Sequence, residues 1–171
     1  ISTKVLLEYL DQQNQKELSV LELGAGCGIV SFRCAQKGAM VTASDISSLA
    51  IDNLKANQKS TGLDVKIQKS DLFDSVAEKF DLVVINPPYY PKDPNSEAEK
   101  AWYCGAEFQY FEKLANQLGN HLTRDGFALM ILSEDCEIVR IRQILESGIL
   151  KMEQILSVTN FGEVNYLFRL S

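Results

Sequence analysis

No apolar run in this 171-residue sequence reaches the roughly 18–20 residues that a membrane-spanning helix needs. The first residues also lack the basic, apolar and small-residue segments of a secretory signal. Cysteine is sparse as well: Cys27, Cys34, Cys104 and Cys136 form no C-x-x-C pair, so neither a metal site nor a redox dithiol is expected. The sequence therefore predicts a soluble cytoplasmic protein with reduced thiols.

Histidine and basic residues are also scarce. His121 is the single histidine and no G-x-S-x-G elbow is present, so a Ser-His-Asp hydrolase is disfavoured. The 17 Lys and Arg residues are outnumbered by 23 Asp and Glu residues, which gives a formal charge of −6. This is the wrong sign for a protein that holds nucleic acid by neutralising phosphates. Unaided nucleic-acid binding is therefore less expected, although a basic partner or an additional segment could deliver such a substrate.

Short apolar, β-branched runs alternate with stretches of helical period, which is the pattern of a mainly parallel sheet covered by helices. The expected strands are residues 19–23, 40–44, 65–69, 82–85, 127–132, 152–158 and 164–170. The expected helices are residues 29–37, 47–59, 108–121 and 136–147. The linker between the last two strands is too short for a helical crossover, so they should form an antiparallel hairpin. Residues 1–171 should form one α/β domain. Because the sequence starts at Ile1 within a helical pattern, a longer chain with an upstream segment is an alternative.

All four prolines fall within one irregular stretch, residues 87–107, which begins where the fourth expected strand ends. A loop of this length in a compact domain is usually functional or mobile. Ligands of open α/β sheets bind at the carboxyl ends of strands. The functional site is therefore expected at this edge of the sheet, and the charged stretch at residues 97–100 reads most simply as solvated surface.

The sequence L-E-L-G-A-G-C-G at residues 21–28 runs from a strand into a helix, with glycine at alternate positions where a ligand can approach bare backbone. A dinucleotide-binding G-x-G-x-x-G motif would need glycine where this chain has Ile29. A tight turn without a ligand is the alternative. The spacing favours a nucleoside ligand without a pyrophosphate, and the residues expected to contact it here are Glu22, Gly24, Ala25, Gly26 and Gly28.

Acidic residues follow the next two expected strands. Asp45 ends the second strand, where a carboxylate can accept hydrogen bonds from both hydroxyls of a ribose. It could equally cap the next helix, a role for which Ser47 competes. Asp71 follows the third strand and could accept a hydrogen bond from an adenine amino group, with Leu72 against the ring; a solvated turn is the alternative. Ile46 and Leu72 complete the predicted nucleoside site.

The sequence Asn86-Pro87-Pro88-Tyr89 directly follows the apolar strand at residues 82–85. An amide or aromatic amino nitrogen is a poor nucleophile because its lone pair is delocalised, so a catalyst must accept its N–H hydrogens. The side-chain oxygen of Asn86 and the carbonyl of Pro87 can do this together, and the prolines stiffen the loop. Tyr89 can stack on the planar group and align its nitrogen with a methyl donor. Asn86, Pro87 and Tyr89 are therefore the predicted catalytic residues, with a merely rigid turn as the alternative.

The glycine loop, Asp45, Asp71 and the Asn-Pro-Pro-Tyr tetrad together resemble the ordered motifs of class I S-adenosylmethionine-dependent methyltransferases. The resemblance covers nearly the whole chain and implies a Rossmann-like, seven-stranded, mostly parallel sheet with one antiparallel strand in the C-terminal hairpin and helices on both faces. It also implies S-adenosyl-L-methionine as cofactor, S-adenosyl-L-homocysteine as product, and Asn86 as a contact of both cofactor and acceptor.

Within that class the sequence is similar to the HemK-type glutamine methyltransferases, which modify the Gly-Gly-Gln motif of peptide-chain release factors. Residues 101–105 resemble their A-W-A-G-G segment, with Cys104 in place of the first glycine of the pair. The N-terminal helical domain that is usual in the bacterial enzymes is not part of this sequence. The resemblance implies a protein substrate bearing a glutamine, with an activating partner or an upstream segment as an open requirement.

Other functions stay open at this point. The same tetrad occurs in adenine amino-methyltransferases of DNA and RNA, so adenine methylation is the alternative to glutamine methylation. The acidic composition favours the protein substrate. A non-catalytic partner that keeps the fold is a weaker hypothesis, as is a nicotinamide-dependent oxidoreductase, which Ile29 disfavours.

Overall fold

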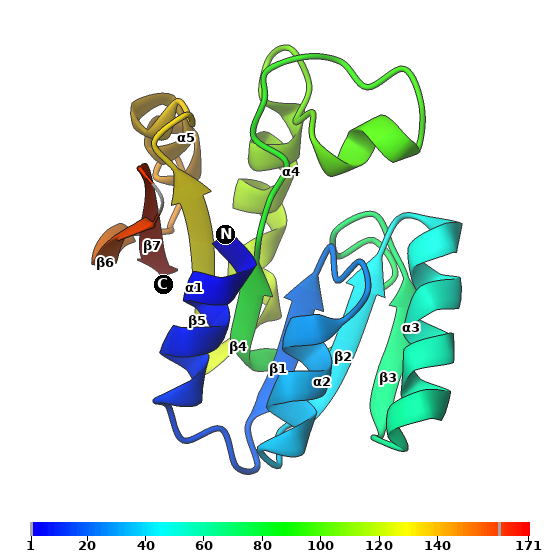
Figure 1. Cartoon of the computed structure of the whole chain (residues 1–171). Coiled ribbons are helices and arrows are strands. Elements are labelled where there is room, and N and C mark those ends of the chain that lie inside the picture. Colours follow the sequence, from blue (N-terminus) through cyan, green and yellow to red (C-terminus); the bar gives the residue numbers. More distant parts are fainter. Residues whose placement is uncertain (1, 161) are drawn as a thin grey trace.

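Seven strands form one mixed sheet in the computed structural model, which describes residues 2–160 and 162–171 (Figure 1). They are β1 (Ser19–Leu23), β2 (Met40–Asp45), β3 (Val65–Lys69), β4 (Phe80–Ile85), β5 (Leu122–Ser133), β6 (Met152–Asn160) and β7 (Glu163–Leu170). Their order across the sheet is β3-β2-β1-β4-β5-β7-β6. All pairs from β3 to β5 are parallel, whereas β7 runs antiparallel to both β5 and β6. This arrangement confirms the predicted Rossmann-like sheet and its C-terminal hairpin.

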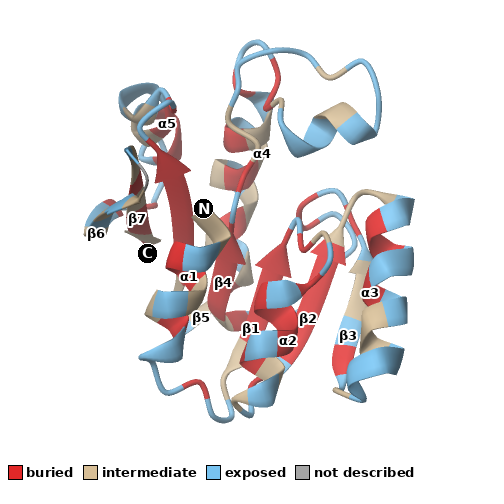
Figure 2. Ribbon diagram, viewed as in Figure 1, coloured by how far each residue is buried: buried red, intermediate tan, exposed pale blue. Residues whose placement is uncertain are grey.

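Helices cover both faces of the sheet, as predicted. They are α1 (Ser2–Asp11), α2 (Ile29–Gln36), α3 (Ser48–Thr61), α4 (Gln109–Gln117) and α5 (Ile138–Leu145), with short 3₁₀ helices η1 (Ala98–Ala101) and η2 (Leu118–His121). The apolar side chains of α1, α2 and α3 form one core cluster with the sheet, and those of α4 and α5 form the other. Figure 2 shows the central strands buried between these two layers.

The strand β4 contributes to both core clusters. Val83 and Ile85 lie in the cluster with α4 and α5, whereas Leu82 and Val84 lie in the cluster with α1, α2 and α3. Successive side chains of a strand point to opposite faces of its sheet, so a strand covered on both faces reads as a continuous apolar run. Because the run of buried residues ends at Ile85, β4 ends there and Asn86 is the first residue after the strand.

The largest departures from the predicted boundaries concern β5 and α4. The strand β5 begins at residue 122 rather than 127, because Asp81 draws the polar segment before residue 127 into the sheet. Its Oδ1 accepts a hydrogen bond from Thr123 Oγ1 at 2.8 Å, and its Oδ2 accepts from Ser19 N and Oγ at 2.9 and 2.7 Å. The helix expected at residues 108–121 is divided into α4 and η2.

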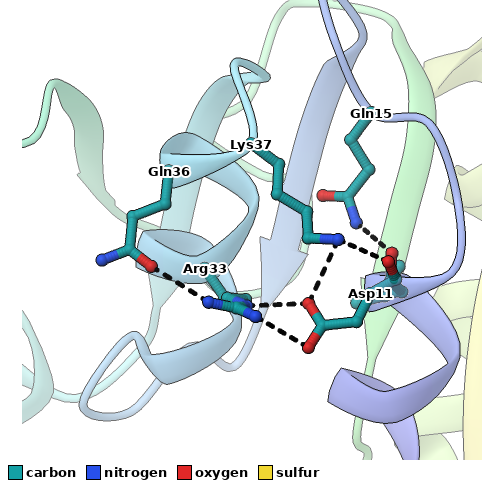
Figure 3. Close-up of polar contacts among 6 residues, drawn as sticks. Asp11, Gln15, Arg33, Gln36 and Lys37 are labelled. Carbon is teal, nitrogen blue, oxygen red and sulfur yellow. Dashed lines mark hydrogen bonds and ion pairs between the residues drawn. The ribbon is translucent and has the colours of Figure 1, made fainter.

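An ion-pair cluster joins the C-terminal ends of α1 and α2 (Figure 3). Asp11 accepts hydrogen bonds from Arg33 Nε at 2.7 Å and Nη2 at 2.9 Å, and Lys37 Nζ lies 3.3 Å from its Oδ1. The hydrogen bond from Arg33 holds the pKa of Asp11 at about 2, below its ordinary value of 3.8. The buried Gln15 donates from Nε2 to the Leu10 carbonyl at 2.6 Å. The contacts of Asp11 attach the end of α1 to that of α2, and the bond from Gln15 holds the segment after α1 against the helix end.

Within residues 2–160 and 162–171, no helix is both long and apolar enough to cross a membrane. All four cysteines are free, and only Cys27 among them is exposed. Burial raises the pKa of Cys34 to about 12 and that of Cys136 to about 11. These two thiols are therefore protonated at neutral pH.

Candidate active site

A cavity of about 660 Å³ opens at the carboxyl ends of β1, β2 and β4. The strand β1 lies between β2 and β4: the chain continues from β1 through β2 and β3 on one side and then crosses to β4 on the other. Ligands of open α/β sheets bind at such a switch point. The cavity brings together predicted residues from four separate segments. They are Gly24, Gly26, Asp45, Ile46, Asp71, Leu72 and Asn86.

The glycines of the loop after β1 have two different roles. Gly24 and Gly26 have φ angles of +69° and +55°, and a Cβ atom at either position would meet no atom within 4 Å. They present open backbone to the cavity. Gly28 also has a positive φ, but a Cβ there would lie 2.4 Å from Leu54 Cδ2 and 2.8 Å from the Phe32 ring. Gly28 is therefore required for the close approach of α2 and α3, and it lies outside the cavity lining.

Two other predicted residues of this loop also lie outside the lining. Ala25 is buried in the core, and its N–H donates to the Ser44 carbonyl at 2.9 Å. Glu22 is 8% exposed and accepts hydrogen bonds from Ser31 N at 2.8 Å and Ser31 Oγ at 2.5 Å, in the first turn of α2. Burial, opposed by the hydrogen bonds from Ser31 and aided by the charge of Asp45, raises the pKa of Glu22 to about 7. Glu22 therefore supports the loop from behind.

Asp45 connects the glycine loop to the start of α3. Its Oδ2 accepts a hydrogen bond from Gly26 N at 2.9 Å, and its Oδ1 accepts from Ser47 N at 2.8 Å. Ser47 is the residue that caps α3, since its Oγ accepts from Ala50 N at 3.4 Å. Each carboxylate oxygen has more than one acceptor position, so Asp45 can still receive ligand hydroxyls from the cavity that it lines.

The turn after β3 presents Asp71 and Leu72 to the same cavity. Leu72 has a φ of +49°, a left-handed conformation that is unfavourable for a branched side chain. Its side chain is buried in the cavity wall, whereas that of Asp71 is half-exposed. Across the cavity, α4 contributes Tyr110 and Lys113 to the lining. Burial and the nearby carboxylates of Asp71 and Asp45 raise the pKa of the Tyr110 hydroxyl, which is protonated at neutral pH.

The predicted catalytic tetrad begins at the end of β4. The side chain of Asn86 is exposed at the cavity and forms no hydrogen bond with any residue in the described part of the chain. Pro87 is buried, and Pro88 lines the cavity. Tyr89 lies outside the lining and packs against the core cluster of α4 and α5, with its ring centroid 4.7 Å from that of Tyr90. Asn86 thus faces the cavity, while Tyr89 lies on the other side of the loop.

The proline-containing segment continues across the cavity as far as α3. Residues 90 and 103 pair in a short bridge, and η1 lies between them. Glu97, just before η1, accepts a hydrogen bond from Ser48 N at 2.9 Å, in the first turn of α3. The segment at residues 97–100 is mostly exposed, as the sequence predicts, and its residues Glu97, Ala98 and Lys100 also line the cavity.

Sequence reasoning missed the contributions of this segment and of α4 to the site. For the proline-containing segment, the only sequence signal was the length of the loop. For α4, the helical spacing of apolar residues gave no indication that Tyr110 and Lys113 line the cavity. The roles of the predicted residues, within the lining and behind it, stay predictions.

Residues 1–161 match the family model described as methyltransferase small domain. The chain belongs to this family. Membership confirms the predicted enzyme class, a methyltransferase. Relatives in sequence include the release factor glutamine methyltransferases of Streptococcus pneumoniae, 38% identical over 56% of this chain and 35% of that protein, and of Lactococcus lactis, 31% identical over 72% and 51%.

A ribosomal RNA small subunit methyltransferase C of Actinobacillus pleuropneumoniae is 31% identical over 52% of this methyltransferase domain and 27% of that protein. The chain thus spans less than two thirds of the length of these curated relatives.

Solved methyltransferases share the fold. The Mtq2–Trm112 complex of E. cuniculi, described as responsible for methylating the termination factor eRF1, has a TM-score of 0.75 at 19% identity, covering 99% of this chain and 94% of that chain. A 16S rRNA methyltransferase of T. thermophilus, solved with AdoMet and guanosine, has a TM-score of 0.70 at 20% identity, covering 98% and 42%.

Proposed function

We propose that this domain transfers a methyl group from S-adenosyl-L-methionine to the side-chain amide nitrogen of a glutamine in a protein, such as a release factor. The observation that carries this proposal is the position of Asn86. Its free side-chain amide lies at the rim of a nucleoside-sized cavity, directly after a strand that is buried on both faces. A hydrogen-bonding group held there can receive an acceptor nitrogen beside the donor.

S-adenosyl-L-methionine is the cofactor of this domain, as the sequence predicts, and the methyltransferase family supports it. The cavity fits this molecule. Gly24 and Gly26 leave open backbone for its amino-acid end, Asp45 supplies acceptors for the ribose hydroxyls, and Asp71 with Leu72 offers an acceptor and an apolar surface for the base. When bound, the donor supplies an electrophilic methyl group on a positively charged sulfur.

The chain's own residues act on the acceptor nitrogen. Asn86 Oδ1 accepts one N–H hydrogen, and the Pro87 carbonyl accepts the other. These contacts turn the lone pair of the nitrogen toward the donor and stabilise the positive charge that grows on the N–H groups. Such contacts accelerate the reaction because they are stronger in the transition state than in the ground state. Tyr89, whose ring packs beside that of Tyr90, offers a flat surface on which the planar amide can stack.

Charge supports a protein acceptor. The net charge is −6, and the segment over the cavity contributes the carboxylates of Asp93 and Glu97 to the lining. Negative groups at the entrance repel a phosphate backbone. The two release factor methyltransferases named above are 38% and 31% identical to the matched parts of this chain, and the ribosomal RNA relative is 31% identical. The match to that relative nevertheless makes the amino group of adenine or of another RNA base the second candidate acceptor, since the same tetrad can accept hydrogen bonds from an aromatic amino nitrogen.

The need for a partner is part of the proposal. The curated relatives are longer than this chain, and the structural neighbour of E. cuniculi is a complex with Trm112. We expect a further segment or a partner protein to bind the release factor outside the catalytic cavity.

Labelled methyl transfer tests the proposed function. The chain would be incubated with methyl-labelled donor and either a release factor, the same factor with its Gly-Gly-Gln glutamine changed to asparagine, or ribosomal RNA. Label on the unaltered factor alone is the expected result. Label on RNA, with none on the factor, would transfer the assignment to the second candidate.

A further inference from the structure

The turn that presents Asp71 to the donor cavity cannot hold its shape by local preference alone. Leu72 adopts a left-handed backbone at φ +49°, a conformation that L-residues with a bulky side chain rarely adopt. Strained positions of this kind persist where surrounding contacts determine them, and they gather at ligand sites. The side chain of Asp71 is also 52% exposed, so the turn by itself does not restrict the rotation of the carboxylate.

The contacts that hold the turn come from α4. Lys113 Nζ lies 2.8 Å from Asp71 Oδ2 and 2.7 Å from Asp74 Oδ2, so one ammonium joins the carboxylates on both sides of Leu72. One helical turn later, Gln117 Nε2 donates to Asp74 Oδ1 at 2.9 Å, and Gln117 Oε1 accepts from Phe73 N at 3.4 Å. Lys113 and Gln117 therefore clamp the turn from one face of α4.

The clamp leaves one oxygen of Asp71 available. Lys113 occupies Oδ2, whereas Oδ1 accepts no hydrogen bond from residues 2–160 or 162–171. Both residues line the donor cavity. We infer that Lys113 is a positioning residue for base recognition: by holding Asp71 Oδ2, it directs Oδ1 toward the amino group of the donor's adenine. This inference rests on the proposed donor site and adds the residue that sets its selectivity for the base.

The chemistry of the two possible bases shows how this selectivity arises. An adenine amino group donates a hydrogen bond to a carboxylate, whereas the carbonyl oxygen of hypoxanthine at the same ring position is an acceptor and is repelled. A hydrogen bond to a charged group discriminates on the order of tenfold or more when its partner is fixed. If the ammonium of Lys113 is removed, the carboxylate of the half-exposed Asp71 can turn into solvent. Neither base then meets a fixed hydrogen-bond acceptor, so the two compounds should bind with similar affinity.

Calorimetric titration of the whole chain with S-adenosylhomocysteine and S-inosylhomocysteine tests this inference through the ratio of the two affinities. We expect the wild type to prefer the adenine compound by on the order of tenfold or more. Lys113→Met should bring the ratio close to one, mainly by weakening the adenine compound, and Lys113→Arg should restore the preference. Lys66→Met is the matched control, since it also removes a lysine that pairs with a carboxylate, that of Glu78, but neither residue lines the cavity; it should keep the preference.

A general loss of stability in Lys113→Met would weaken both compounds equally, so the ratio separates positioning from folding. Asp71→Asn combined with Lys113→Met should give the same ratio as Asp71→Asn alone, because Lys113 acts through Asp71. A wild type that binds neither compound would overturn the proposed donor site together with this inference. A wild type without preference, or a Lys113→Met variant that keeps it, would overturn the inference alone.

Discussion

The buried carboxyl of Glu22 should make the stability of the ligand-free domain decrease as the pH rises from about 4.5 to about 7. Burial raises its pKa in the folded state to about 7, against an ordinary value of 4.5. The folded state therefore binds the proton more tightly than the unfolded state does. The resulting stabilisation is complete below pH 4.5 and is lost as the pH passes through 7. A pKa difference of about 2.5 corresponds to about 3 kcal/mol in the free energy of unfolding.

Substitution of Glu22 by glutamine isolates this contribution. The amide oxygen can still accept the hydrogen bonds of Ser31, but it carries no charge at any pH. We expect urea unfolding between pH 5 and 8 to show a flatter profile for Glu22→Gln, with the variant more stable than the wild type at pH 8. Glu8→Gln, on the exposed face of α1, is the matched control and should follow the wild type. Parallel profiles for wild type and Glu22→Gln would show that the folded protein does not penalise this charge.

Three further outcomes are expected. Asn86→Ala should slow single-turnover methyl transfer on the order of 10²–10³-fold while leaving the affinity for S-adenosylhomocysteine nearly unchanged; a near-normal rate would reduce the tetrad to a stiff turn. Asp45→Ala should abolish most of the rise in melting temperature that S-adenosylhomocysteine causes, and an unaltered rise would remove Asp45 from the ribose site. Gly28→Ala should lower the free energy of unfolding by about 1–3 kcal/mol because its Cβ would lie 2.4 Å from Leu54 Cδ2. Gly148→Ala, where a Cβ meets no atom within 4 Å, should be close to neutral in the same urea titration, and equal midpoints for the two would mean that α2 moves aside at little cost.

The sheet and the position of its functional edge were predictable because strong local patterns determine them. Residues 82–85 of β4 are covered on both faces and are all apolar, so the polar Asn86 stands out directly after them, and Asp45 likewise ends the largely buried β2. The start of β5 was not predictable in this way. Its first residues are polar and join the sheet through Asp81, a contact between segments 42 residues apart in the sequence.

Glycine shows another limit of sequence reasoning. Gly26 and Gly28 both need a left-handed backbone, and the sequence offers no means to separate bare backbone facing a ligand from close packing of two helices. The contribution of α4 was out of reach for a different reason. Lys113 looks like an ordinary helical surface residue until the fold places it beside the turn after β3.

The segment that crosses the cavity also limits how this domain can be redesigned. It begins with the residues proposed to receive the acceptor, and a few residues later it lines the cavity proposed for the donor and reaches α3 through Glu97. An engineer who exchanged this segment to change the acceptor would rebuild part of the donor site in the same step. Variants selected for a new acceptor should therefore be screened for donor affinity as well, and compensating changes are best sought in the first turn of α3.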